Sequence, residues 1–118
     1  MYVATPRTPQ ISSELLDQVL HGQALMLADG GMGTLIQQAG LAGIHELPDL
    51  LNLTHASDIR ALQRRYVEAG SDCIATNTFS SNRLKLAGTG TSVDELFAAA
   101  AQIAREAGAP LVAGDIGP

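Results

Sequence analysis

Residues 71–81 read SDCIATNTFSS, and this stretch decides how the rest of the chain is interpreted. Its first half, around Cys73, Ile74 and Ala75, is small and apolar, as in a buried strand. Its second half changes to hydroxyl and amide side chains around one aromatic residue, Phe79. In parallel α/β folds the carboxyl ends of strands border ligand sites, so this polar ending predicts a site at the end of the strand.

Two further apolar runs with polar or glycine-rich endings flank this strand along the chain. ALMLADGG (24–31) precedes it and PLVAGDIGP (110–118) follows it, which predicts strands near positions 25, 72 and 111. The first run does not alternate between apolar and polar residues. We therefore expect that strand to be buried on both faces, as in a parallel sheet.

Two amphipathic helices are predicted between these strands. Residues 54–70 carry apolar side chains at helical spacing, with Thr54 or Ser57 as the N-cap and Gly70 at the end. Residues 92–108 open with the capping box S-x-x-E and present a face of small residues suited to packing against a sheet. The resulting order β-α-β-α-β predicts an α/β fold with a parallel sheet. Three other segments are assigned as a short helix from Ser12 or Ser13 to Gly22, an irregular stretch at 41–53 and a loop at 83–92.

The three strand ends together form the candidate ligand site. Asp29 can accept hydrogen bonds from a substrate ammonium group, and backbone N–H groups near Gly30 and Gly31 can hold a carboxylate. An amino acid has both groups. The alternative is purely structural, because Asp and Gly are common in turns and Asp29 can serve as a helix N-cap. The predicted substrate-binding residues are Asp29, Gly30, Gly31, Thr76, Asn77 and Asp115, joined at the strand ends by Thr78 and Gly114.

Composition and charge exclude several other classes of protein. The chain has 118 residues, enough for one domain or part of a larger one, and 46% of them are hydrophobic. Seven basic residues stand against twelve acidic ones, a balance that disfavours nucleic acid as a partner. No apolar run is long enough to cross a membrane and no secretory signal is visible, so a cytoplasmic protein is expected.

The motifs of several common sites are missing from the sequence. DGGMG fits neither the dinucleotide fingerprint nor the Walker A loop. The three histidines are scattered, and the single cysteine, Cys73, lies in a predicted core strand. We therefore expect no metal ligand and no catalytic residue in this chain. No serine-hydrolase elbow is present.

Three longer segments carry a specific resemblance. LADGGMGTLIQ, LLNLTHASDIRALQRRYVEAGSDCIATNTFSSNRLKL and LVAGDIGP resemble the opening segments of the homocysteine S-methyltransferase family, in the same order and spacing. That family includes the homocysteine-binding module of cobalamin-dependent methionine synthase and betaine–homocysteine methyltransferase. The resemblance covers residues 24–118, and residues 1–23 are assigned as a lead-in with a short helix.

The resemblance implies a (β/α)₈ TIM barrel that transfers a methyl group to the thiol of homocysteine to make methionine. It implies that this chain is the N-terminal part of such a barrel, with about three strands and their helices, because the full fold typically needs about 250 residues. Asp29 and Gly30 would then be substrate contacts from the first strand, with Thr76 and Asn77 in the wall formed by the second strand. Zinc, bound by three cysteines, would hold the thiolate in the complete protein, and those cysteines lie in later segments.

The role of position 75, the methyl donor and the class of function are not determined by the sequence. Many relatives have glutamate where this chain has Ala75, which leaves the role of that position undecided. The methyl donor is open too, and a cobalamin or folate system is one possibility. A non-catalytic amino-acid-binding or interaction module, half of a split protein and an unrelated (β/α)₈ enzyme are the alternatives. We expect the chain alone to lack methyltransferase activity and to self-associate through open sheet edges.

Overall fold

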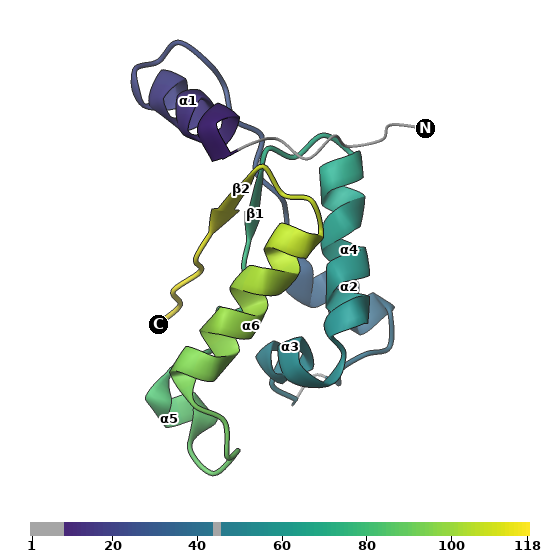
Figure 1. The fold of residues 1–118 in the computed structure, drawn as a ribbon. Helices are drawn as coiled ribbons and strands as arrows, with labels where there is room; N and C mark the ends of the chain where they lie inside the picture. The colour runs from purple at the N-terminus through teal and green to yellow at the C-terminus, as the bar shows by residue number, and fades with distance from the viewer. Residues whose placement is uncertain (1–8, 44–45) are drawn as a thin grey trace.

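The computed structural model of the chain describes the backbone of residues 9–43 and 46–118, and the side chains from Ser13 onward apart from that gap. A small parallel sheet lies beside a layer of helices, and α1 lies apart from this layer, near the end where the strands begin (Figure 1). The elements are α1 Pro9–Leu20, α2 Met32–Gln38, the 3₁₀ helix η1 Pro48–Leu50, α3 Leu51–Thr54, α4 Ala56–Glu68, β1 Cys73–Ala75, α5 Arg83–Leu86, α6 Val93–Glu106 and β2 Leu111–Ala113.

The parallel sheet is smaller than the sequence predicted. β1 and β2 pair in parallel, with Cys73 opposite Leu111 and Ala75 opposite Ala113. The predicted first strand is present only as a single parallel bridge from Ala28 to Cys73. Backbone bonds from Asp29 N to Cys73 O (3.0 Å) and from Cys73 N to Leu27 O (3.2 Å) hold it beside β1. The predicted order of segments is therefore confirmed, while the extent of the first strand is not.

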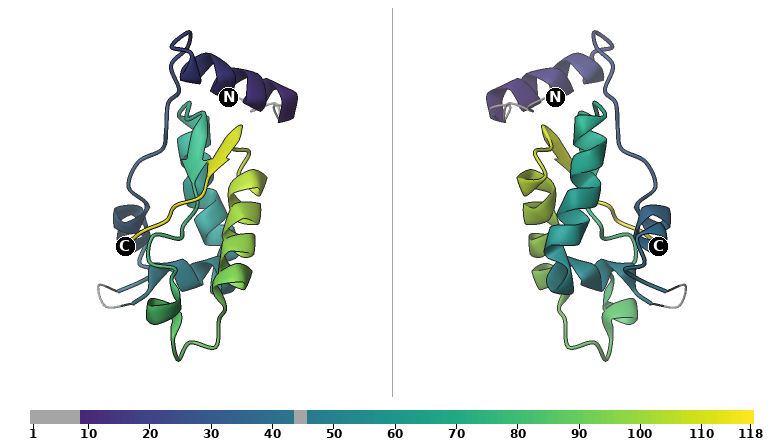
Figure 2. Two further views of the ribbon diagram at one scale, coloured as in Figure 1. Left: turned by 90° about the vertical axis from the view of Figure 1, so that its left-hand side faces the viewer. Right: turned by 90° about the vertical axis from the view of Figure 1, so that its right-hand side faces the viewer.

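The expectation that the 24–28 run is buried on both faces is wrong. Leu25 is 95% exposed and Leu27 is 57% exposed. Burial on both faces requires helices on both sides of a parallel sheet. In the part of the chain that the structure describes, α4 and α6 lie on one side of β1 and β2 (Figure 2). The apolar composition of this run is thus real, but the partners that would bury it are not among the described elements.

The helix layer supplies most of the core. One cluster of buried side chains joins α2, α3, α4 and α6, and a second packs α4 and α6 against β1 through Val67, Ala104 and Ile74. Arg60 on α4 pairs with Glu106 on α6 at 2.5 Å. Hydrogen bonds from Gln102 and then from Arg60 lower the pKa of the Glu106 carboxyl. The members of the first cluster are Ile36, Leu51, Ile59, Leu62 and Ile103.

The helix ends show which local signals were informative. The predicted cap of α6 is confirmed, since the Ser92 side chain accepts from Glu95 N at 3.1 Å. The predicted N-cap of α4, Thr54 or Ser57, is wrong, because its N-cap is His55 and that residue makes no side-chain cap bond. α1 begins at Pro9 rather than after Ser12 or Ser13, in keeping with the preference for proline in the first helical turn. The segments read as irregular or loop contain the short elements η1, α3 and α5.

The exposed leucines beside β1 make self-association testable. We expect the average mass of the chain in solution to rise with concentration, because an unpaired parallel edge and apolar side chains such as Leu25 and Leu27 favour association. The double variant Leu25→Lys, Leu27→Lys should reduce this rise in sedimentation-velocity runs. Gln37→Lys, an exposed change on α2, is the matched control for added charge. A chain that stays monomeric up to high concentration would contradict the expectation.

Candidate functional site

A cavity of about 310 Å³ lies at the carboxyl ends of the strands. All three segments predicted to meet there contribute to its wall, and η1 and Phe79 complete it. The structure thus brings together all six residues predicted from the sequence to bind substrate. These are Asp29, Gly30, Gly31, Thr76, Asn77 and Asp115, alongside Met32, Gly33, Pro48, Asp49, Ala75, Thr78, Phe79 and Ser80.

Asp29 is held by β1 rather than by the helix that follows it. Its Oδ2 accepts a hydrogen bond from Ala75 N at 3.2 Å. The N-cap of α2 is Gly31, with no side-chain cap bond, so the structural alternative of Asp29 as a helix cap does not apply. Burial raises the pKa of the Asp29 carboxyl, the bond from Ala75 opposes that rise, and the nearby charge of Asp115 adds to it. Asp29 therefore carries a partly desolvated carboxyl group at the cavity.

Thr76 and Thr78 form an internal hydrogen-bonded pair. Their Oγ1 atoms lie 2.7 Å apart. Thr78 Oγ1 donates to Asp115 O at 2.8 Å, and Thr76 Oγ1 accepts from Asp115 N at 3.0 Å. Both hydroxyls are thus used to bind the backbone of Asp115 to the end of β1. This placement explains why the strand ends in threonines, and it leaves Asp115 as the residue that the pair presents to the cavity.

Asn77 connects β1 to the segment that precedes α4. Its Nδ2 donates to Pro48 O at 3.1 Å, and its backbone oxygen accepts from Asn52 Nδ2 at 2.7 Å. Asn52 Nδ2 also donates to Asp49 O at 2.7 Å. The Nδ2 group of Asn77 is therefore used within the protein, which points to a role in shaping the cavity wall.

Asp49 is a charged residue of the site that was not predicted from the sequence. It is 2% exposed, lines the cavity from η1, and accepts from Ser80 N (2.8 Å) and Ser81 Oγ (2.6 Å) through Oδ2. Burial raises the pKa of its carboxyl, while the bonds from Ser81 and Ser80 oppose that rise. An aspartate after Pro48 in an aperiodic stretch reads as a turn residue, so no local signal would have distinguished it.

Two glycines allow close approach of neighbouring groups. A side chain at Gly30 would meet Tyr66, whose Oη also donates to Gly31 O at 3.0 Å. A side chain at Gly117 would collide with the carbonyl oxygen of Phe79. Tyr66 on α4 thus holds the turn after Asp29, and the segment after β2 presses on the backbone of Phe79.

The electrostatic character of the cavity is acidic. Asp29, Asp49 and Asp115 all line it, and none of its lining residues in the described part of the chain is Lys, Arg or His. The charge of Asp115 raises the pKa of both other carboxyls, and Lys85 lowers that of Asp49. A cavity with this lining is suited to a ligand with a cationic group such as an ammonium.

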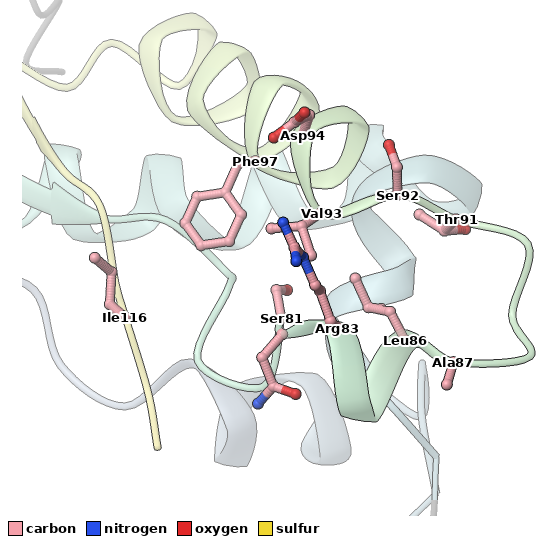
Figure 3. Close-up of a pocket in the computed structure, with 11 residues that line it drawn as sticks. Ser81, Arg83, Leu86, Ala87, Thr91, Ser92, Val93, Asp94, Phe97 and Ile116 are labelled. Atoms are coloured by element: carbon pink, nitrogen blue, oxygen red, sulfur yellow. The ribbon is translucent and has the colours of Figure 1, made fainter.

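A second cavity of about 630 Å³ lies between α5, the start of α6 and the segment after β2. Figure 3 shows Arg83, Phe97 and Ile116 among the side chains around it. It is larger than the first cavity, but its wall comes mainly from α5, the loop after α5 and the start of α6, and the segments that follow β1 and β2 add only Ser81, Asn82 and Ile116. We assign the candidate site to the smaller cavity, because the strand ends and their buried hydrogen bonds converge there.

The described residues of this chain do not form a zinc site, and the resemblance places the zinc cysteines in later segments. Within the described ranges, no group of three or more His, Cys, Asp or Glu side chains is placed to hold a metal ion. Cys73 is buried in β1, and burial raises the pKa of its thiol, which disfavours the thiolate that zinc needs. His21 Nδ1 lies 2.8 Å from Asp17 O, and His55 Nδ1 lies 2.8 Å from Thr54 Oγ1. His45 lies outside the described residues.

None of the helices in residues 9–43 and 46–118 is long and apolar enough to span a membrane.

Known proteins similar to this chain share one activity in their names. Methionine synthase of Mycobacterium leprae (strain TN) is 36% identical over 87 residues, which is 70% of this chain and 7% of that protein. Methionine synthase of Mycobacterium tuberculosis (strain ATCC 25618 / H37Rv) is 37% identical over 75 residues, which is 59% of this chain and 6% of that protein. The chain therefore spans a small part of the length of these relatives.

A solved structure of a homocysteine methyltransferase is also similar to this chain. The homocysteine methyltransferase MmuM from Escherichia coli, in its metallated form, matches with a TM-score of 0.69 and 25% identity over 87% of this chain and 41% of that chain. The fold is thus a mixed α/β arrangement similar to part of that enzyme. A sequence model of the homocysteine S-methyltransferase family matches residues 26–118. Since this match extends over most of the sequence and confirms the resemblance drawn from its motifs, the chain belongs to the homocysteine S-methyltransferase family.

Proposed function

We propose that this chain supplies the amino-acid-binding wall of a (β/α)₈ enzyme that transfers a methyl group to the thiol of homocysteine, giving methionine. The observation that carries the proposal is the convergence of Asp29, Gly30, Gly31 and Asp115 on one acidic cavity in a member of this family. The names of the similar proteins support methyl transfer to homocysteine for a complete enzyme.

In this proposal the two ends of the amino acid are recognised by different groups. The Asp29 carboxylate accepts hydrogen bonds from the substrate ammonium, with the charge of Asp115 adding to the attraction. Backbone N–H groups around Gly30 and Gly31 bind the substrate carboxylate. Thr76 and Asn77 contribute by fixing the wall, since their side chains already bond Asp115 and Pro48. In this proposal the described residues hold the substrate, and the group for the methyl transfer itself would come from other segments.

Zinc belongs to the proposal only for the complete protein. The described residues offer no suitable ligand set, so its ligands would come from other segments. Bound there, zinc would keep the homocysteine sulfur as a thiolate at neutral pH. The methyl donor, with a cobalamin or folate system among the candidates, is likewise a property of other segments. We therefore expect no methyl transfer by this chain alone.

Asp29→Asn tests the ammonium contact. The chain is titrated with L-homocysteine under reducing conditions, and amide shifts are followed by NMR. We expect the substitution to weaken binding by about 10- to 100-fold, because a hydrogen bond to a charged group is worth about 1.5–3 kcal/mol. Asn can still accept the bond from Ala75 N, so the end of β1 should stay in place. Asp58→Asn, an exposed change on α4, is the control.

Two further measurements sharpen this test. 4-Sulfanylbutanoate lacks the amino group, and its affinity should not fall in Asp29→Asn, because the substitution then removes only a like charge. Binding of L-homocysteine should fall as pH drops through the raised pKa of Asp29, because the carboxylate is then neutralised. Equal affinity of the two chains for L-homocysteine would refute the assignment.

The same raised pKa affects the stability of the fold. The contribution of Asp29 to the free energy of unfolding is greatest at pH values below the ordinary carboxyl pKa of 3.8, and it is lost as pH rises through the folded-state pKa.

A further inference from the structure

The Asp49 carboxylate accepts two hydrogen bonds from consecutive residues that follow β1. Its Oδ2 accepts from Ser80 N at 2.8 Å and from Ser81 Oγ at 2.6 Å. Bonds to an ionised carboxylate are stronger than neutral ones. Because the side chain is only 2% exposed, water competes little for this oxygen. Asp49 therefore fixes the backbone position of Ser80.

The segment that carries Asp49 is itself fixed to β1. Asn77 Nδ2 donates to Pro48 O, and Asn52 Nδ2 donates to both Asp49 O and Asn77 O. The carboxylate is thus presented from a turn that cannot move independently of the strand end. Its bonds to Ser80 and Ser81 define the geometry of the turn that follows the strand.

Phe79 is the residue whose position depends on this arrangement. It immediately precedes Ser80, lines the cavity, and is 56% exposed. On its other side Gly117 lies against its carbonyl oxygen, at a distance that excludes a side chain. The backbone of Phe79 is therefore held between the Asp49 bonds and the segment after β2, while its ring borders the acidic cavity.

We propose that Asp49 is a positioning residue, which holds the turn after β1 so that the Phe79 ring forms an apolar wall for the side chain of the amino-acid ligand. This rests on the proposed function, since it takes the cavity as an amino-acid site. The alternative is that Asp49 contacts the ligand directly. It is disfavoured because the side chain is nearly inaccessible and Oδ2 already has two donors.

Fluorine NMR can test this directly, because the chain has only two phenylalanines. Phe79 reports on the first cavity, while Phe97 borders the second cavity and serves as an internal reference (Figure 3). The full chain labelled with 4-fluorophenylalanine is compared with Asp49→Ala and Asp49→Asn. Phe97→Leu assigns the two lines.

We expect Asp49→Ala to shift and broaden the Phe79 line while the Phe97 line stays in place. Asp49→Asn should restore the original Phe79 line, since an amide oxygen can still accept from Ser80 and Ser81. Affinity for L-homocysteine should fall about fourfold in Asp49→Ala, the equivalent of roughly one buried methylene, and recover in Asp49→Asn. Because Asp115 and Lys85 also face Asp49, all spectra are recorded at one pH.

Each outcome decides the matter. An unchanged Phe79 line in Asp49→Ala overturns the proposal, and so does a line in Asp49→Asn that moves as far as in Asp49→Ala. If Asp49→Ala fails to fold, Ser81→Ala removes one of the two bonds and must move the Phe79 line in the same direction. Absence of any L-homocysteine effect on the unsubstituted chain counts against the proposed function, whereas the spectra of the variants without ligand judge whether Asp49 positions Phe79.

Discussion

Ile59→Ala is expected to lower the free energy of unfolding by about 2–5 kcal/mol. Ile59 on α4 is completely buried and lies in the cluster that joins α2, α3, α4 and α6. Removing three methyl or methylene carbons there loses their transfer free energy and leaves a cavity that helices from four parts of the chain cannot close together. Because domains are typically stable by only about 5–15 kcal/mol, this change removes a large share of the stability of the chain.

Urea unfolding followed by circular dichroism measures this loss. The matched control is Ile116→Ala, the same change at a side chain that is 86% exposed, which should alter stability by less than about 0.5 kcal/mol. Equal effects at the two positions would mean that the helix layer does not form the core described here.

Thr78→Val should cost about 1–3 kcal/mol and loosen the segment after β2. The substitution keeps the shape of a fully buried side chain but removes the hydroxyl that donates to Asp115 O and pairs with Thr76 Oγ1. Asp115 O then loses a partner inside the protein. Since Asp115 is one of the three carboxylates at the cavity, we also expect weaker binding of L-homocysteine.

Amide hydrogen exchange at Asp115 is the direct measurement, because its N–H donates to Thr76 Oγ1 in the same network. Exchange there should accelerate more than at Leu111, whose N–H bonds Asp72 O at the start of β2. Thr34→Val, at an exposed position on α2, controls for the change of residue type. Unchanged exchange at Asp115 would show that the Thr76–Thr78 pair does not hold this segment.

Local sequence signals predicted the elements that depend on local interactions. Ser92 and the apolar periodicity that follows it specify α6, and Gly70, with φ of 109°, ends the turn after α4 as expected. The convergence of the strand ends was also predictable, because parallel pairing places them at one edge whatever the details of each turn. Residues from three separate segments could therefore be assigned to one cavity from their order alone.

Other features depend on distant partners and have no local signal. The apolar run at 24–28 predicts burial, but burial needs elements on both faces of the sheet. Thr76 and Asn77 are predicted from the sequence as substrate-binding residues. That their side chains bond Asp115 and Pro48 could not be predicted, because these partners depend on where β2 and η1 lie. Asp49 became visible only when the fold placed it beside Ser80 and Ser81.

The central place of β1 has a consequence for the order of folding. Its parallel neighbours, Ala28 and the strand from Leu111 to Ala113, lie far along the chain on either side. Forming such pairs closes long loops, which is slow compared with forming helices. During synthesis on the ribosome, α4 would be complete before β2 emerged. Until then, the edge of β1 that pairs with β2 would remain unpaired. The cavity, whose wall includes Asp115, would therefore be among the last features to form.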